Sequence, residues 1–478
     1  MIAAAAFVLG LALPPLPVVR ATSANAARYV RLRLDVVAYG IPGRGEILID
    51  RAGGRFVRRF DAGPVSDREG FDGVRAWRAD STGMARVQGN ADQRGAIVAD
   101  SYLYARAPRP ATADAFDGSV RLRYGGLSRT MDVRAGDGLL SEARRGVGED
   151  TVSTTFAGYR AVAGLRVPFA LSEQSSNGTW SAQVRSVEPL RDVPRDAFAP
   201  PPAPHDATLA QVTRIPLDPG EVIQVRINGA APMRFLLDTG GQNVITPQAA
   251  ARLGMTVSGR GSVGGAGAGT APARYTIARS IKIGAAELRN QPFVVLDLGP
   301  SAPFEGIVGY EVFARFAARL DFARHTLELA PSATAFGTRG TPVPMVFDDR
   351  QPQVRGAIDG LPAAITIDTG SDEAVDVNTP FVRAHRLEQT YHVTPRGMLF
   401  YGVGGGVDGW RATALELRLG NVVVRDVRLA LTDARAGVEM DPSVAANVGD
   451  QVLHRFTIVF DYRNGMLRFT PASKSLSP

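Results

Sequence analysis

Residues 235–240 read Phe-Leu-Leu-Asp-Thr-Gly, and residues 365–370 read Ile-Thr-Ile-Asp-Thr-Gly. Each stretch is an apolar run that ends in the tripeptide Asp-Thr-Gly. This pattern predicts a buried strand that breaks into a tight turn and presents the carboxylate of Asp238 or Asp368. Asp and Gly are common in turns for backbone reasons alone, so one such tripeptide is weak evidence. Two copies, each opening the same longer pattern, indicate a duplicated unit.

The two copies continue in the same order over about 100 residues each. Three features follow each tripeptide: a Gly-rich segment, a strand ending in Gly, and a short run ending in Gly. They lie at 263–267, 281–284 and 306–309 in the first copy, and at 403–406, 417–420 and 447–449 in the second. Five more residues of the first copy recur at a constant offset in the second: Val312, Arg315, Phe316, Asp321 and Leu327 recur as Val452, Arg455, Phe456, Asp461 and Leu467. The repeat predicts a β-rich lobe present twice.

Each copy resembles a lobe of the retropepsin-like aspartic proteases, and the pair resembles the two-lobed arrangement of the pepsin superfamily. The resemblance covers residues 208–472 and implies, in each lobe, an Asp-Thr-Gly turn, a flap and an apolar-apolar-Gly strand beneath the Asp. The run Ile-Val-Gly at 307–309 fits that strand, whereas Asn447 departs from it in the second copy. We therefore expect an all-β fold with one lobe over 207–335 and the other over 341–473.

The resemblance implies that Asp238 and Asp368 are the catalytic residues. Two carboxylates that share one proton supply both a base for water and an acid for the carbonyl oxygen, because neighbouring like charges cannot both ionise. Such a pair titrates as a unit. The family further implies supporting roles for the residues that follow each Asp, with Thr hydroxyls bonding across the lobes and Gly permitting close backbone approach. These residues are Thr239, Gly240, Thr369, Gly370 and Ser371.

One difference between the copies predicts an asymmetric pair. Gly241 follows the first tripeptide, where the family usually has Ser or Ala, and Ser371 follows the second. A hydroxyl donated to Asp368 would favour its charged form. The sequence thus predicts that Asp368 carries the negative charge and Asp238 the shared proton, with Ser371 as the donor.

The Gly-rich stretches at 261–269 and 401–409 are predicted to be flaps, one on each lobe. Glycine permits hinge motion and close approach to a substrate backbone. Two flaps would make the site resemble a fused retropepsin dimer, with a peptide bound in extended form. The flap residues expected to contact substrate are Gly264, Gly265, Tyr275, Tyr401, Gly404 and Gly405.

The chain begins with an apolar segment over residues 2–19, followed by Ala-Asn-Ala at 24–26. This pattern predicts a signal peptide over 1–26, cleaved after Ala26, and a periplasmic protein. A membrane anchor is disfavoured because Pro14, Pro15 and Pro17 interrupt a short run. The mature chain is therefore expected to have no membrane span.

Residues 28–188 alternate apolar and polar residues between turn signals, which predicts an antiparallel β domain. Its Gly-Arg-Phe at 54–56, Gly-Phe-Asp-Gly at 70–73 and Trp77 loosely resemble periplasmic lipoprotein-carrier half-barrels. A scaffold or substrate-docking role is favoured over lipid binding. The Pro-rich stretch at 189–206 is predicted to be a semi-rigid linker.

Composition excludes several other kinds of site. The chain has 478 residues, no Cys, five His and a net charge of +7. The basic residues are nearly all Arg and are spread among acidic ones, so no nucleic-acid partner is predicted. The His residues lack metal-ligand spacing, so no metal or cofactor is expected. The acidic residues Asp372, Glu373 and Asp376 are interpreted as a solvated loop, with a cation or substrate-charge site as the alternative.

Two functions remain open from the sequence. The first is an endopeptidase that uses Asp238 and Asp368 on a peptide or protein substrate. The second is a non-catalytic protein that binds peptide or envelope lipid on a peptidase-like fold. Because both lobes belong to one chain, the protein is expected to be a monomer.

Overall fold

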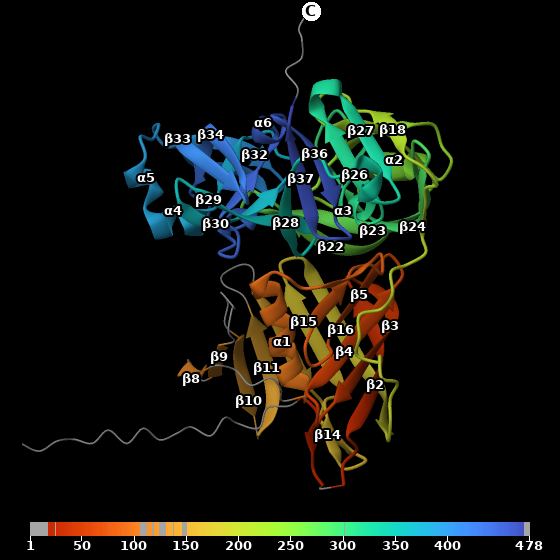
Figure 1. Cartoon of the computed structure of the whole chain (residues 1–478). Helices are drawn as coiled ribbons and strands as arrows, with labels where there is room; N and C mark the ends of the chain where they lie inside the picture. The colour runs from red at the N-terminus through yellow and green to blue at the C-terminus, as the bar shows by residue number, and fades with distance from the viewer. Residues whose placement is uncertain are drawn as a thin grey trace, which may run out of the picture.

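The computed structural model describes residues 18–23, 25–105, 112–116, 119–123, 131–136, 138–145, 151–300 and 302–472. Figure 1 shows an N-terminal sheet domain below two β-rich lobes, which lie side by side. The prediction of a mostly β protein with short helices is confirmed. Within the described residues, no helix is both long enough and apolar enough to cross a membrane.

The N-terminal domain is an antiparallel sheet of 13 strands in the order β7-β6-β5-β4-β3-β2-β16-β15-β12-β11-β10-β9-β8. Alternate residues of β2 are buried, as the period-two sequence pattern predicts. The strands are β2 (Tyr29–Ala38), β3 (Ile41–Asp50), β4 (Arg55–Ala62), β5 (Val65–Phe71), β6 (Ala76–Ala79), β7 (Ala85–Val87), β8 (Thr112–Phe116), β9 (Ser119–Arg123), β10 (Met131–Gly136), β11 (Leu139–Arg145), β12 (Val152–Ala157), β15 (Ala170–Ser175) and β16 (Gly178–Leu190).

A helix that the strand pattern did not predict packs on this sheet. Helix α1 (Ala91–Ala105) contacts β3, β4, β5 and β6, and it buries Ile97, Leu103 and Tyr104. The backbone N–H of Gln93 donates to the Asn90 side chain at 3.2 Å, which caps the first turn. The domain is therefore a sheet with a helix on one face.

Part of the predicted signal peptide is packed into this domain. Residues 1–17 and 24 lie outside the described residues, but Val18 and Val19 are fully buried in the domain core. Strand β1 (Arg20–Ala21) pairs with β14 (Leu165–Val167), which also pairs with β13 (Arg160–Val162). Cleavage after Ala26 stays a prediction, and it would remove β1 together with both valines.

The predicted linker is more structured than its proline content indicates. Its first two residues belong to β16, which ends at Leu190. Phe198 is buried, and its carbonyl accepts a 2.8 Å hydrogen bond from the indole N–H of Trp77. This segment is held against the N-terminal domain before the chain enters the first lobe.

The first lobe contains an eight-stranded sheet in the order β17-β24-β21-β25-β20-β19-β23-β22. Its strands are β17 (Ala207–Thr208), β19 (Val222–Ile227), β20 (Met233–Leu237), β21 (Val244–Ile245), β22 (Ser258–Gly264), β23 (Thr270–Ile283), β24 (Ala286–Leu296) and β25 (Gly306–Val308).

A second 13-stranded sheet runs from the first lobe into the second, because β26 pairs with β36. Its strands are β18 (Thr213–Pro216), β26 (Ala317–Asp321), β27 (Thr326–Ala330), β28 (Thr341–Asp348), β29 (Gln351–Ile358), β30 (Leu361–Ile367), β31 (Val375–Val377), β32 (Gly397–Gly402), β33 (Gly405–Leu419), β34 (Val422–Thr432), β35 (Ala446–Val448), β36 (Phe456–Asp461) and β37 (Met466–Pro471). The helices of the two lobes are α2 (Pro247–Arg252), α3 (Tyr310–Phe313), α4 (Thr379–His385), α5 (Leu387–Thr390) and α6 (Asp450–Leu453), with short 3-10 turns η2 (Phe322–Arg324), η3 (Ala333–Phe336) and η4 (Val438–Met440).

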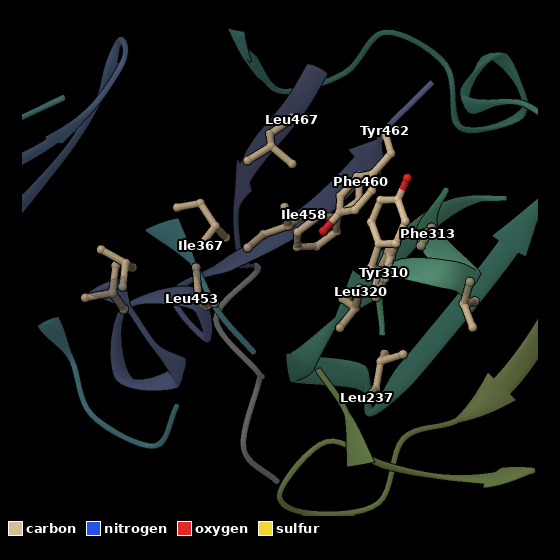
Figure 2. Packing of buried hydrophobic residues seen from close by; sticks show 14 of the residues in the cluster. Leu237, Tyr310, Phe313, Leu320, Ile367, Leu453, Ile458, Phe460, Tyr462 and Leu467 are labelled. Atoms are coloured by element: carbon tan, nitrogen blue, oxygen red, sulfur yellow. The ribbon is translucent and has the colours of Figure 1, made fainter. Parts of the chain in front are cut away.

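One hydrophobic core spans both lobes. Figure 2 shows Phe313 and Tyr310 from the first lobe beside Phe460 and Tyr462 from the second. The rings of Phe313 and Tyr462 are stacked with centroids 5.3 Å apart. This shared core fixes the two lobes, and hence the two Asp-Thr-Gly turns, relative to each other.

Candidate active site

The two Asp-Thr-Gly turns lie at equivalent places in the two lobes. β20 pairs in parallel with β25 in the first lobe, as β30 does with β35 in the second. The backbone N–H of Asp238 donates to the carbonyl of Val308 at 3.0 Å, and that of Asp368 donates to Val448 at 2.9 Å. The supporting strand therefore holds both turns alike, even in the lobe where it departs from the apolar pattern.

The two threonines bond across the lobes, as the resemblance implies. The Thr239 hydroxyl donates to the carbonyl of Ile367 at 2.8 Å and accepts from the backbone N–H of Thr369 at 3.0 Å. The Thr369 hydroxyl donates to the carbonyl of Leu237 at 2.7 Å and accepts from the N–H of Thr239 at 3.1 Å. These four hydrogen bonds join the two turns. Both threonines are buried, which strengthens the bonds because the surroundings have a low dielectric constant.

The carboxyl groups of the two turns face each other. A Cβ atom on Gly240 would lie 2.5 Å from the carboxyl group of Asp368, and one on Gly370 would lie 2.5 Å from that of Asp238. Each glycine thus leaves the space that the opposite carboxyl group fills. Gly240 N–H donates to Asp238 Oδ1, and Gly370 N–H donates to Asp368 Oδ1, each at 2.8 Å.

The pair is electrostatically asymmetric. Burial raises the pKa of Asp238 well above its usual range, and the charge and hydrogen bond of Asp368 raise it further. The side-chain amide of Asn447 donates to Oδ2 of Asp368 at 2.9 Å. A donor to a carboxylate favours its charged form, so this arrangement favours placing the shared proton on Asp238.

The prediction that the Ser371 hydroxyl donates to Asp368 was wrong. The Ser371 hydroxyl donates to Oδ2 of Asp376 at 3.1 Å, and Asn447 takes the expected place beside Asp368. The equivalent of Ser371 in the first lobe is Gly241, where a Cβ atom would lie 2.4 Å from Oδ2 of Asp238. The first turn therefore leaves no room for a side chain there in this arrangement.

Two hairpins form the flaps, and their tips touch. The first is β22–β23 and the second is β32–β33. The N–H of Gly267 donates to the carbonyl of Val403, and the N–H of Gly269 donates to the carbonyl of Gly404, both at 2.9 Å. A Cβ atom on Gly267 would lie 2.2 Å from Gly404, so glycine is required for this contact. The two flap tips are therefore joined to each other by backbone hydrogen bonds.

The predicted flap residues have different roles. The Gly265 carbonyl accepts from the N–H of Val438 at 3.0 Å, which fastens the first flap to the second lobe. Gly404 and Gly405 form the turn of the second flap with φ values of 90° and 118°, a region that favours glycine. Gly264 ends β22, and a Cβ atom there would meet nothing within 4 Å.

The two predicted flap tyrosines have different surroundings. Tyr275 packs on Tyr39 of the N-terminal domain, with ring centroids 5.2 Å apart, and also against the apolar cluster of Val244, Ala273, Val294 and Leu296, so its contact with a peptide stays a prediction. Tyr401 is 78% exposed and turns its ring to solvent. A position beside a Gly-rich segment does not determine the direction in which a side chain points.

The interpretation of residues 372–376 as a solvated loop was also wrong for two residues. Asp376 is the middle residue of β31 and is only 3% exposed. Glu373 forms a bidentate ion pair with Arg411, with hydrogen bonds of 2.9 and 2.8 Å. All three residues of β31 are buried, so the strand is covered on both faces, whereas the alternation of Val-Asp-Val in the sequence predicts an exposed Asp.

A further cluster joins the lobes away from the flaps. Nε2 of His454 lies 2.8 Å from Oε1 of Glu221, and ligand atoms of these residues and Asp450 lie within 4.8 Å of one another. Burial, followed by Glu221, raises the pKa of Asp450 to about 10. These residues could supply metal ligands, a set that spacing rules miss because Glu221 comes from the other lobe.

Comparison with known families supports the same assignment. Residues 223–312 match the aspartyl protease family model. The match covers the first Asp-Thr-Gly turn, the first flap and the supporting strand β25. No curated protein matches the chain. The match supports an aspartic-type peptidase in general.

Proposed function

We propose that the protein is an endopeptidase that hydrolyses peptide bonds with water activated between Asp238 and Asp368. The observation that carries the proposal is the pair of facing carboxyl groups, each filling the space above the opposite glycine. Both carboxyl groups come from one chain, which supports activity as a monomer. No cofactor is required by this chemistry.

The two carboxyl groups divide the proton transfers. Charged Asp368 accepts a proton from water as the water oxygen bonds to the peptide carbonyl carbon. Protonated Asp238 gives its proton to the carbonyl oxygen. In the second step, Asp368 protonates the leaving nitrogen, the C–N bond breaks, and Asp238 regains a proton from the diol intermediate. The products are a peptide with a new carboxylic acid and a peptide with a new amine, and the pair returns to charged Asp368 and protonated Asp238.

The closed flaps support binding of an extended peptide. Their tips hydrogen-bond to each other. In this proposal the tips cover the carboxyl pair, and a substrate separates them before it reaches the carboxyl groups. Once a peptide is bound, the hairpins offer backbone groups for strand-like pairing and exclude water from the site. We further propose that the protein acts in the periplasm, which the N-terminal apolar segment and Ala-Asn-Ala motif support.

Cleavage of a diverse peptide library, read by mass spectrometry between pH 3 and pH 7, tests the proposal. Asp238→Asn and Asp368→Asn are each expected to abolish cleavage, because one carboxyl group cannot perform both transfers. Asp426→Asn, at an exposed position on β34, is the control and keeps full activity. Substantial activity in either active-site variant would refute the shared-proton mechanism. Absence of cleavage by the folded wild type would favour the non-catalytic alternative.

A further inference from the structure

The duplicated lobes place different chemistry at equivalent positions beside the carboxyl pair. In the first lobe, β21 runs antiparallel to β25 and pairs Val244 with Ile307. In the second, β31 runs antiparallel to β35 and pairs Asp376 with Asn447. Residues directly opposite in such a pair point to the same face of the sheet. An apolar pair in one lobe is therefore replaced by a polar pair in the other.

The wall beside Asp238 is apolar. Its buried members pack with partly buried residues of both flaps, which brings the wall under the closed hairpins. We call this set the apolar wall: Val244, Ala273, Val294 and Leu296, with Val263, Ala271, Tyr275, Leu298, Ile307 and Val403 packed against them.

The wall beside Asp368 is acidic, and we define the acidic wall as Asp376, Asn447 and Glu439. Asn447 faces the catalytic pair, because its amide donates to Asp368. Asp376 shares that face and accepts from Ser371, but its Oδ1 has no partner among the described residues. The Oδ1 atom of Asn447 is likewise buried without a partner in the described part of the chain.

Glu439 completes the acidic wall from η4. The N–H of Val438, the preceding residue, donates to the carbonyl of Gly265 at 3.0 Å, so η4 lies against the first flap. Glu439 is 4% exposed, and its Oε2 has no hydrogen-bond partner among the described residues. Burial and then the charge of Asp368 raise the pKa of Glu439 to about 7. The carboxyl groups of Glu439 and Asp368 therefore repel each other when both are charged.

No cationic side chain among the described residues forms an ion pair with Asp376 or Glu439 of the acidic wall. Burial raises the pKa of Asp376 well above its usual range, and repulsion by Glu439 and Glu373 raises it further. The nearby guanidinium of Arg411 is already held by Glu373. A buried carboxylate without a countercharge is costly, and a bound ammonium or guanidinium group would supply both that charge and hydrogen bonds to Oδ1 of Asp376 and Oε2 of Glu439.

We propose that the acidic wall is a subsite for a basic side chain of the substrate, Lys or Arg, while the apolar wall receives an apolar side chain. The inference rests on the proposed peptidase function, and it names the substrate class of that same site. The enzyme then prefers segments in which a basic and an apolar residue flank the scissile bond, and the asymmetry of the lobes sets the direction in which the peptide binds.

Two matched peptides test the subsite, one with Lys and one with norleucine at the position that library cleavage assigns to the second lobe. Norleucine keeps the length of the chain and lacks the charge. Wild-type enzyme is expected to show a kcat/KM about tenfold or more higher for Lys, the scale of a hydrogen-bonded charge. Glu439→Gln is expected to lower that ratio at least about fivefold. Glu287→Gln, which removes a carboxylate from a surface pair with Lys282, leaves the ratio unchanged.

The outcomes separate this inference from the proposed function. Equal cleavage of the two peptides by wild type would overturn the subsite and leave the peptidase intact. If neither peptide is cleaved, the proposed peptidase function is contradicted. The subsite is then tested by the affinities of the two labelled peptides for Asp238→Asn, and equal affinities would overturn it. If Glu439→Gln does not fold, Asp376→Asn replaces it, and an unchanged Lys preference in that variant counts against the proposal.

Discussion

The side-chain amide of Asn447 donates a 2.9 Å hydrogen bond to Oδ2 of Asp368. In the first lobe the equivalent residue is Ile307, which has no polar atom to offer Asp238. The two carboxyl groups have nearly the same backbone support, so their surroundings differ in side chains, and Asn447 is the one that donates directly to a carboxyl group of the pair. It provides the asymmetry that the sequence analysis assigned to Ser371.

Asn447→Ile, which copies the first lobe, is expected to move the acid limb of the pH profile of kcat/KM upward. The lost hydrogen bond favoured the charged form of the pair, so the first proton leaves at higher pH without it. A bond to a charged group is worth about 1.5–3 kcal/mol, which corresponds to roughly 1–2 pH units. Ser371→Ala serves as the control and keeps the limb in place, because its hydroxyl bonds to Asp376. A shift in Ser371→Ala alone would reverse the assignment of the donor.

Thr369→Val is expected to lower both the free energy of unfolding and kcat. The change keeps the shape of the side chain but leaves the buried N–H of Thr239 and the carbonyl of Leu237 without their partners. Each loss costs about 1–3 kcal/mol. Urea unfolding measures the stability, and Thr413→Val, at an exposed strand position, controls for the change of residue type. Equal stability of Thr369→Val and wild type would show that the cross-lobe bonds contribute little.

Glu311→Gln is expected to flatten the pH dependence of stability. Burial raises the pKa of Glu311 from 4.5 to about 7, with a further contribution from Asp80. A raised pKa in the folded state means that stability is complete below the unfolded value and is lost as the pH rises through about 7. The loss from this group reaches about 3 kcal/mol above pH 8.

The amide in Glu311→Gln does not titrate and still accepts the 2.9 Å hydrogen bond from the N–H of Asn243. Gln451 occupies the corresponding place in the second lobe by the constant offset of the repeat. Chemical denaturation at pH 5 and pH 8 gives the two free energies for wild type, for the variant and for the surface control Glu287→Gln. A pH difference in Glu311→Gln as large as in wild type would contradict the assignment.

Tyr39→Asn is expected to loosen the first flap and leave the second unchanged. The Tyr39 ring packs on Tyr275 of β23, and the Tyr39 carbonyl accepts from Arg260 N–H of β22 at 2.8 Å. Asn suits the left-handed backbone at this position, where φ is 51°, and it removes the ring. Loss of an aromatic pair of about 0.5–1.5 kcal/mol speeds opening roughly twofold to tenfold.

Hydrogen exchange over residues 258–275 and 397–409 measures the two flaps separately. Tyr401→Asn is the matched control, since its ring is in solvent. Equal acceleration of both flaps in Tyr39→Asn would mean that they open as one unit.

The sequence predicted the parts of the site that follow from the repeat. The pair Asp238 and Asp368, the crossing threonines and the two hairpins all depend on local patterns that occur twice, and the structure brings them together. Asn447 was visible only as a departure from an apolar position. The role of Asn447 as a hydrogen-bond donor depends on its distance to Asp368, which the sequence pattern does not give.

The remaining features depend on contacts between distant segments. Tyr275 was expected to close over a peptide because it lies beside a Gly-rich stretch, and its contact with Tyr39 of the N-terminal domain could not be read from that position. Helix α1 interrupts a strand-rich region, and its short apolar stretch does not distinguish helix from strand by periodicity alone. The burial of Glu439 could not be predicted from the sequence, because a lone acidic residue between strands is usually solvated.

The pairing of β26 with β36 has a consequence for how the chain is assembled. Strands of the first lobe complete a sheet that the second lobe continues, and a single core is built from residues of both. Neither half closes its own interior, so the halves must acquire their native structure in one cooperative step. A gene fragment that encodes one half would leave an open sheet edge and a bare apolar face, which favours aggregation over an independently folded product.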